Sequence, residues 1–110
     1  MQKTIKIGER EVALRPSAAT PYRYTNVFHE NFFTAIESVM KTEDGLDSME
    51  TISKLCYIMA MQAEGADMNA LNEQTFEEWL DQYSFMELSN ALGDVLEVYT
   101  DSAKTNVAPK

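Results

Sequence analysis

The sequence predicts a mainly helical α+β protein, in which an N-terminal β-hairpin is followed by a bundle of about four helices. Three observations predict this fold class. Apolar and polar residues alternate on both sides of Gly8, whereas apolar residues after residue 20 recur at helical spacing. Motifs that start helices occur between the apolar segments. Because 110 residues suffice for one hydrophobic core, we assign residues 1–101 to a single domain.

Residues 3–15 carry the predicted hairpin. Gly8 and Glu9 fit a two-residue turn in which the glycine has a positive φ. This turn sets the register of the two strands, with the cross-strand pairs Ile5 with Val12 and Lys6 with Glu11. An isolated hairpin is only marginally stable in water, so we expect its apolar face to pack on the helices.

The helical part comprises residues 21–101 and begins with a helix that we expect to end near Lys41. Thr20 is suited to cap this helix. Pro21 is suited to its first position, because proline lacks the N–H group that the first turn leaves unpaired. The apolar residues at helical spacing are Phe28, Phe32, Ala35, Ile36 and Val39.

A second helix is expected over about residues 48–64. The polar stretch 42–48 separates it from the first helix. Asp47 and Glu50 fit a capping box at its start, and Gly65 fits its end because glycine readily adopts the left-handed conformation of a helix terminus.

Two further capping boxes predict two more helices, and their residue pairs are Thr75 with Glu78 and Ser84 with Glu87. The first of these helices is short, and the second is expected to end near Asp101. Residues 102–110 contain few apolar side chains. We therefore expect them to form a flexible C-terminal tail.

The net charge of −9 is unevenly distributed along the chain. Residues 1–23 contain five Lys or Arg and two Asp or Glu, whereas residues 24–110 contain four and sixteen. Such an acidic body repels phosphate groups, so we expect neither nucleic acid nor a membrane as a partner. The sequence also lacks an apolar run of membrane-spanning length and a signal-peptide core, which favours a cytoplasmic location.

The sequence contains no complete catalytic or metal-binding motif around the residues that are best suited to one. His29 is the single histidine, and Phe33 stands where an H-E-x-x-H zinc motif needs its second histidine. An EF-hand calcium loop around Gly45 is also ruled out. If Gly45 is aligned with the glycine of that loop, Thr51 stands where the loop needs its bidentate glutamate. Cys56 shares a helical face with apolar residues, so we expect it in the core. We therefore expect no enzymatic activity, cofactor or metal.

Residues 55–61, LCYIMAM, form an apolar run that covers every side of a helix. Such a helix must be enclosed, either by the rest of the chain or by a partner. Enclosure in the core is the first interpretation. Seven methionines favour the alternative, a partner-binding face, because thioether side chains adapt to varied apolar ligands. Residues 79–86, WLDQYSFM, are a second candidate face, for which core packing is again the first interpretation.

Four segments carry a resemblance that covers nearly the whole chain: IKIGEREVALRPSAATPYRYTNVF, LCYIMAMQAEG, EEWLDQYSF and the ending APK. Together they resemble the tail assembly chaperones of long-tailed bacteriophages and prophages. The resemblance implies a protein that keeps the tape measure protein soluble during tail morphogenesis in the cytoplasm of the bacterial host cell, and that is absent from the mature virion. It also implies that residues 108–110 mark the junction to a longer form made by ribosomal frameshifting. Contact of that longer form with the tail tube protein is a further possibility.

We expect apolar helix surface to bind amphipathic segments of the tape measure protein by helix-in-groove contact. Tyr57, Met61, Phe85 and Met86 are the candidate contact residues, because they lie beside or outside the most regular core positions. Self-association through the hairpin edge or the middle helix stays open. The alternative functions are a nucleic-acid mimic that inhibits a host DNA-binding protein, and a small enzyme without familiar motifs.

Overall fold

The N-terminal hairpin consists of the antiparallel strands β1 (Lys3–Ile7) and β2 (Arg10–Leu14). The structure is a computed structural model that describes residues 2–41 and 45–107. The strand register confirms the predicted cross-strand pairs, Ile5 with Val12 and Lys6 with Glu11. Gly8 has a φ of +64°, as the predicted turn requires.

The segment that we predicted as one helix forms two, α1 (Thr20–Phe28) and α2 (Phe32–Lys41). The chain leaves α1 at His29, whose φ of 57° is left-handed and ends the helix. The predicted cap is also wrong, because Ala19 occupies the N-cap position and makes no side-chain capping bond. Thr20 is the first residue of α1 instead.

Polar side chains stabilise the break between α1 and α2. Thr25 Oγ1 accepts a hydrogen bond of 3.2 Å from the backbone N–H of Phe32. Asn31 Oδ1 accepts one of 2.9 Å from the backbone N–H of Thr34, which caps the start of α2. The apolar spacing runs across these bonds without interruption, and it therefore predicted a continuous helix.

The central helix is α3 (Gly45–Glu64). It begins before the predicted start at residue 48, so Asp47 lies inside the helix and not at its cap. Residues 42–44 of the predicted polar connection lie outside the described residues. The end of the helix at Gly65 is confirmed, with a φ of +73°. Residues 55–60 are at most 2% exposed, so the chain itself encloses the apolar run except at Met61, which is half-buried.

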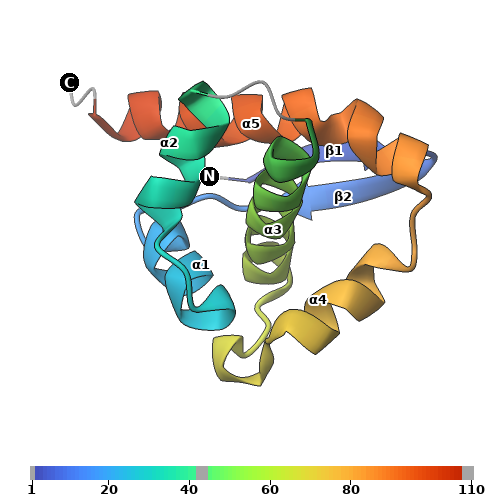
Figure 1. Ribbon diagram of the computed structural model, residues 1–110, viewed down its shortest axis with the longest axis horizontal. Helices are drawn as coiled ribbons and strands as arrows, with labels where there is room; N and C mark the ends of the chain where they lie inside the picture. Colours follow the sequence, from blue (N-terminus) through green and yellow to red (C-terminus); the bar gives the residue numbers. More distant parts are fainter. Residues whose placement is uncertain (1, 42–44, 108–110) are drawn as a thin grey trace.

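The other elements surround α3 on several sides, as Figure 1 shows. β2 and α5 pack against α3, and β1 packs against α5, so the hairpin fills the angle between these two helices. α1 and α2 cover one side of α3, and α4 approaches it from the other. Their buried side chains form one apolar cluster. Within the described residues, none of the helices has the length and hydrophobicity that crossing a membrane requires.

A short 3₁₀ helix, η1 (Met68–Ala70), leads into α4 (Glu73–Leu80). The capping box of α4 joins Asn72 and Thr75, whose side chains each accept the backbone N–H of the other. Our predicted pair, Thr75 with Glu78, was wrong because Asn72 takes the cap position and Thr75 is already inside the helix.

The last helix is α5 (Phe85–Val107), and it runs past the predicted end near residue 101. Its predicted capping box is confirmed by hydrogen bonds between Ser84 and Glu87 in both directions. Residues 102–107, which we predicted as part of a flexible tail, belong to the helix. The sequence contains no glycine or proline from residue 94 to residue 108, so nothing interrupts the helix there. Residues 108–110 lie outside the described residues.

Alanine substitutions at two glycines test the turn and the helix separately. At residue 8, a Cβ atom would meet a positive φ and lie 2.4 Å from Oε2 of Glu87, so Gly8→Ala is expected to lower the free energy of unfolding by about 1–3 kcal/mol. At residue 93 a Cβ atom meets nothing within 4 Å, so Gly93→Ala should raise it by roughly 0.5–1 kcal/mol. Urea denaturation measures both, and equal effects would contradict the structure.

Candidate protein-binding cleft

A mainly apolar cleft of about 220 Å³ lies between α3, α4 and the first turns of α5. Figure 1 shows how the three helices that contribute its lining are arranged. The residues that line the cleft are Met49, Glu50, Ser53, Phe76, Leu80 and Leu88. Phe76 and Leu88 are buried, whereas Met49 and Leu80 are half-buried. The half-buried pair is therefore the apolar surface that an incoming group contacts first.

Aromatic side chains hold α4 against α3 beside the cleft. The ring of Tyr57 on α3 lies 5.4 Å from the rings of both Phe76 and Trp79. The hydroxyl group of Tyr57 donates a 2.8 Å hydrogen bond to Thr75 Oγ1. These contacts fix the aromatic side of α4 against the core. Leu80, one turn after Phe76 on the same helix face, borders the cleft together with Phe76.

Ser53 adds an unpaired polar group to the lining of the cleft. Its side chain is 3% exposed, and its Oγ atom has no hydrogen-bond partner in the described part of the chain. A serine inside a helix commonly bonds to the carbonyl oxygen one turn earlier, and a buried hydroxyl without a partner costs about 1–3 kcal/mol. The Ser53 hydroxyl is therefore an unsatisfied polar group just beneath the surface of the cleft.

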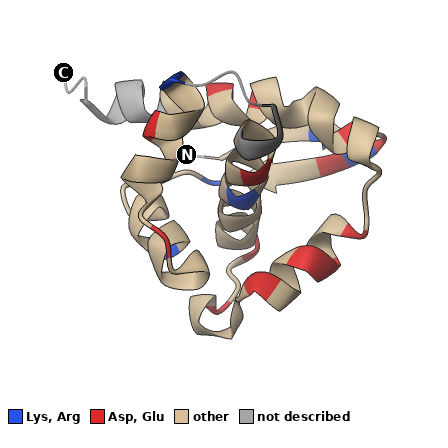
Figure 2. Cartoon of the chain, in the orientation of Figure 1, with Lys and Arg blue, Asp and Glu red and all other residues tan. Residues whose placement is uncertain are grey.

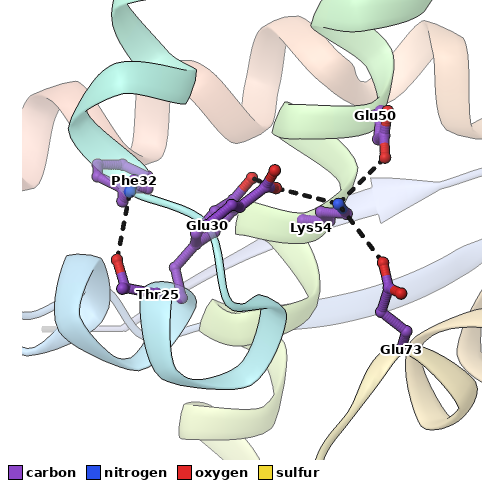
Figure 3. A network of polar contacts seen from close by, with 7 residues as sticks. Thr25, Glu30, Phe32, Glu50, Lys54 and Glu73 are labelled. Carbon is purple, nitrogen blue, oxygen red and sulfur yellow. Dashed lines mark hydrogen bonds and ion pairs between the residues drawn. The ribbon is translucent and has the colours of Figure 1, made fainter.

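A buried cation lies at the border of the cleft. The side chain of Lys54 is 5% exposed, and its Nζ atom lies 3.0 Å from Glu30, 3.1 Å from Glu50 and 3.9 Å from Glu73. Figure 3 shows that the three carboxylates come from the α1–α2 connection, α3 and the start of α4. Burial opposes the charge of Lys54, but hydrogen bonds to Glu30 and Glu50 raise its pKa, so the ammonium group stays charged. The cluster thereby ties the start of α4 to the core.

The structure separates the four predicted contact residues. Phe85 and Met86 are 61% and 63% exposed in the first turn of α5, and Phe85 lies one helical turn before Leu88 of the cleft. Tyr57 is 2% exposed and enclosed by aromatic rings, so it is part of the core. Met61 is half-buried, and neither it nor Tyr57 lines the cleft.

The sequence patterns missed the residues that line the cleft. Leu80 and Leu88 occupy regular apolar positions of their helices, and nothing in the sequence distinguishes Met49 or Ser53 as residues of a cleft. Spacing along a helix shows which residues share a face, but it does not show that two faces leave space between them. The available signal was that Leu80 and Leu88 flank a short connection between two helices.

The groups examined for chemistry lie apart from the cleft. Burial raises the pKa of the Cys56 thiol to about 12, so the reactive thiolate is disfavoured at neutral pH. His29 is exposed at the end of α1. Across residues 2–41 and 45–107, His, Cys, Asp and Glu side chains nowhere gather in threes as a metal site would require.

Alkaline pH is expected to destabilise the protein, in part through Cys56. Burial raises the pKa of the thiol to about 12 in the folded protein, whereas the thiol of the unfolded chain has its ordinary pKa of 9.0. The contribution of Cys56 is therefore complete below pH 9 and falls by about 1.4 kcal/mol per pH unit between these values. Denaturation at several pH values should give a shallower decline for Cys56→Ala than for the wild type, and parallel curves would contradict the burial of the thiol.

Removal of the Ser53 hydroxyl is expected to leave the free protein as stable or more stable by up to about 1 kcal/mol, because no hydrogen bond is lost. Thr20→Val is the matched control. Thr20 Oγ1 is buried but accepts hydrogen bonds from Ser17 N and Gln62 Nε2, so its removal should cost about 1–3 kcal/mol. Thermal and urea unfolding compare the two, and a loss for Ser53→Ala as large as that for Thr20→Val would show that Ser53 is paired.

Comparisons of the chain with protein-family models, with curated proteins and with solved structures found no match.

Proposed function

We propose that this protein is a non-enzymatic chaperone that binds an amphipathic helix of a client protein. The single observation that carries the proposal is the apolar cleft between α3, α4 and α5, next to the exposed Phe85 and Met86. Adjacent exposed apolar side chains of this kind are typical of protein-binding surfaces. An amphipathic helix fits such a surface by inserting side chains spaced three or four residues apart.

The size of the cleft supports a protein partner over a small molecule. Its volume of about 220 Å³ is below the roughly 300–1,000 Å³ that is usual for small-molecule and cofactor sites. A space of this size accepts a few side chains of a helix, while the rest of that helix lies on the rim. Phe85 and Met86 extend the apolar surface along the first turn of α5.

We propose the tape measure protein of a long-tailed bacteriophage as the client, and the cytoplasm of the bacterial host cell as the place of action. The support is the resemblance of the four segments to tail assembly chaperones. A long helical protein exposes apolar helix faces until tail tube subunits surround it. The excess of negative charge on the chaperone would keep the complex from aggregating.

The energetics suit temporary binding. Burial of three or four apolar side chains of a client helix gives roughly 5–10 kcal/mol, from which the cost of association must be subtracted. The net affinity is then micromolar or weaker. Several such sites along a long client would shield it together, and each contact would release readily when tail tube subunits polymerise.

A double substitution in the first turn of α5 tests the proposal. Phe85→Ala with Met86→Ala should lower the soluble fraction of a co-expressed tape measure protein several-fold, because it removes exposed apolar surface beside the cleft. Phe33→Ala with Met40→Ala is the matched control, since these residues on α2 are 59% and 63% exposed. Sedimentation of cell lysates measures solubility, and circular dichroism verifies folding. A loss of solubility with the control pair alone would place the client on α2 and contradict the proposal.

A further inference from the structure

One helix that borders the cleft, α4, carries negative charge and no basic residue. Between Lys54 and Lys104 the sequence contains ten Asp or Glu residues and no Lys, Arg or His. This stretch contains all of α4 and α5 as far as residue 103. Figure 2 shows the acidic residues along α4, which has no basic residue. The carboxylates Asp94 and Glu97 of α5 lie beside Lys3 and Lys6 of β1, away from the cleft. α4 is therefore the helix that presents uncompensated carboxylates beside the cleft.

Three carboxylates stand beside the apolar lining. Glu50 is itself part of the lining. Glu73 precedes Phe76 by three residues, and Glu77 precedes Leu80 by three, so each lies on the helix surface next to an apolar residue of the cleft. The side chain of Glu73 is 68% exposed, and Glu77 is also exposed. Both remain accessible to a bound helix.

The one cation at this border leaves the negative charge in excess. Lys54 lies within 4 Å of three carboxylates and is itself almost fully buried, so a single positive charge faces three negative ones. A ligand with basic side chains would supply the missing positive charge. The unpaired Ser53 hydroxyl in the lining is an independent sign that the site lacks a polar partner.

We propose that the occupant of this cleft is a cationic amphipathic helix. Its apolar side chains would fill the space between Met49, Leu80 and Leu88, and Lys or Arg residues one turn away would pair with Glu73 and Glu77. This inference rests on the proposed function and specifies the chemistry of the client segment. Attraction between the acidic border and a basic helix would speed association and make it sensitive to salt.

Binding of four synthetic peptides to the full-length protein tests the inference by fluorescence anisotropy. Three peptides of roughly 18 residues, about five helical turns, share the same Leu and Phe face and carry Lys, Gln or Glu at the flanking positions. The fourth has the composition of the Lys peptide, but its apolar residues are scattered around the helix. We expect the Lys peptide to bind about tenfold more tightly than the Gln peptide, the Glu peptide and the scattered peptide to bind least, and high salt to remove the advantage.

Two pairs of substitutions with the same change in net charge locate the effect. Glu73→Gln with Glu77→Gln should weaken binding of the Lys peptide by about three- to tenfold, as expected for two exposed ion pairs, and should change binding of the Gln peptide less than about twofold. Because Glu73 also lies 3.9 Å from Lys54, urea denaturation of the variant verifies that α4 stays in place. Glu64→Gln with Glu97→Gln is the control, because both residues are exposed and neither lines the cleft. The control should change affinity less than twofold. Leu80→Ala should weaken binding of all peptides that have the apolar face.

The results separate failure of this inference from failure of the proposed function. Equal binding of the Lys, Gln and Glu peptides, lost in Leu80→Ala, would support the cleft as a helix-binding site and overturn the requirement for a cationic helix. Binding of none of the peptides would overturn both. Binding of the scattered peptide as tightly as the Lys peptide would indicate general charge attraction, as in a nucleic-acid mimic, and would overturn the inference.

Discussion

The fold depends on one constraint, which is that the middle of α3 is apolar on every side and must be kept from water. The hairpin and α5 cover one part of it, α1 and α2 another, and the aromatic side of α4 a third. Around Met49 and Ser53, closer to the start of α3, the cover is incomplete. The proposed binding cleft is thus the place where the enclosure of the central helix is unfinished.

Lys54 connects the enclosure of α3 with the character of the cleft. Its ammonium group lies 5.0 Å from the centre of the Phe28 ring, inside the border of the core, and binds carboxylates from three separate segments. An unpaired ammonium group would be costly in this position. The three carboxylates therefore stabilise the packing of α4, and their excess charge makes the border of the cleft acidic. Stability and ligand preference arise from the same cluster.

Local sequence signals predicted the local features of the fold. Gly8 and the strand alternation gave the correct hairpin register, and Ser84 with Glu87 gave the correct start of α5. The break at His29 was missed because it depends on hydrogen bonds of Thr25 and Asn31, which leave the apolar spacing unchanged. Tyr57 was misjudged because an apolar side chain on an apolar helix gives no sign of which side is covered. The cleft requires the relative placement of three helices, which spacing within one helix does not contain.

The central claim is that an amphipathic helix binds between α3, α4 and α5. Methionine methyl NMR tests it most directly, because Met49 lines the cleft, Met86 is exposed in the first turn of α5, Met40 is exposed on α2 and Met59 is fully buried. On titration with the cationic amphipathic peptide, the account predicts shifts of the Met49 and Met86 methyl signals, with those of Met40 and Met59 unchanged. Shifts at Met40 with an unchanged Met49 signal would contradict it.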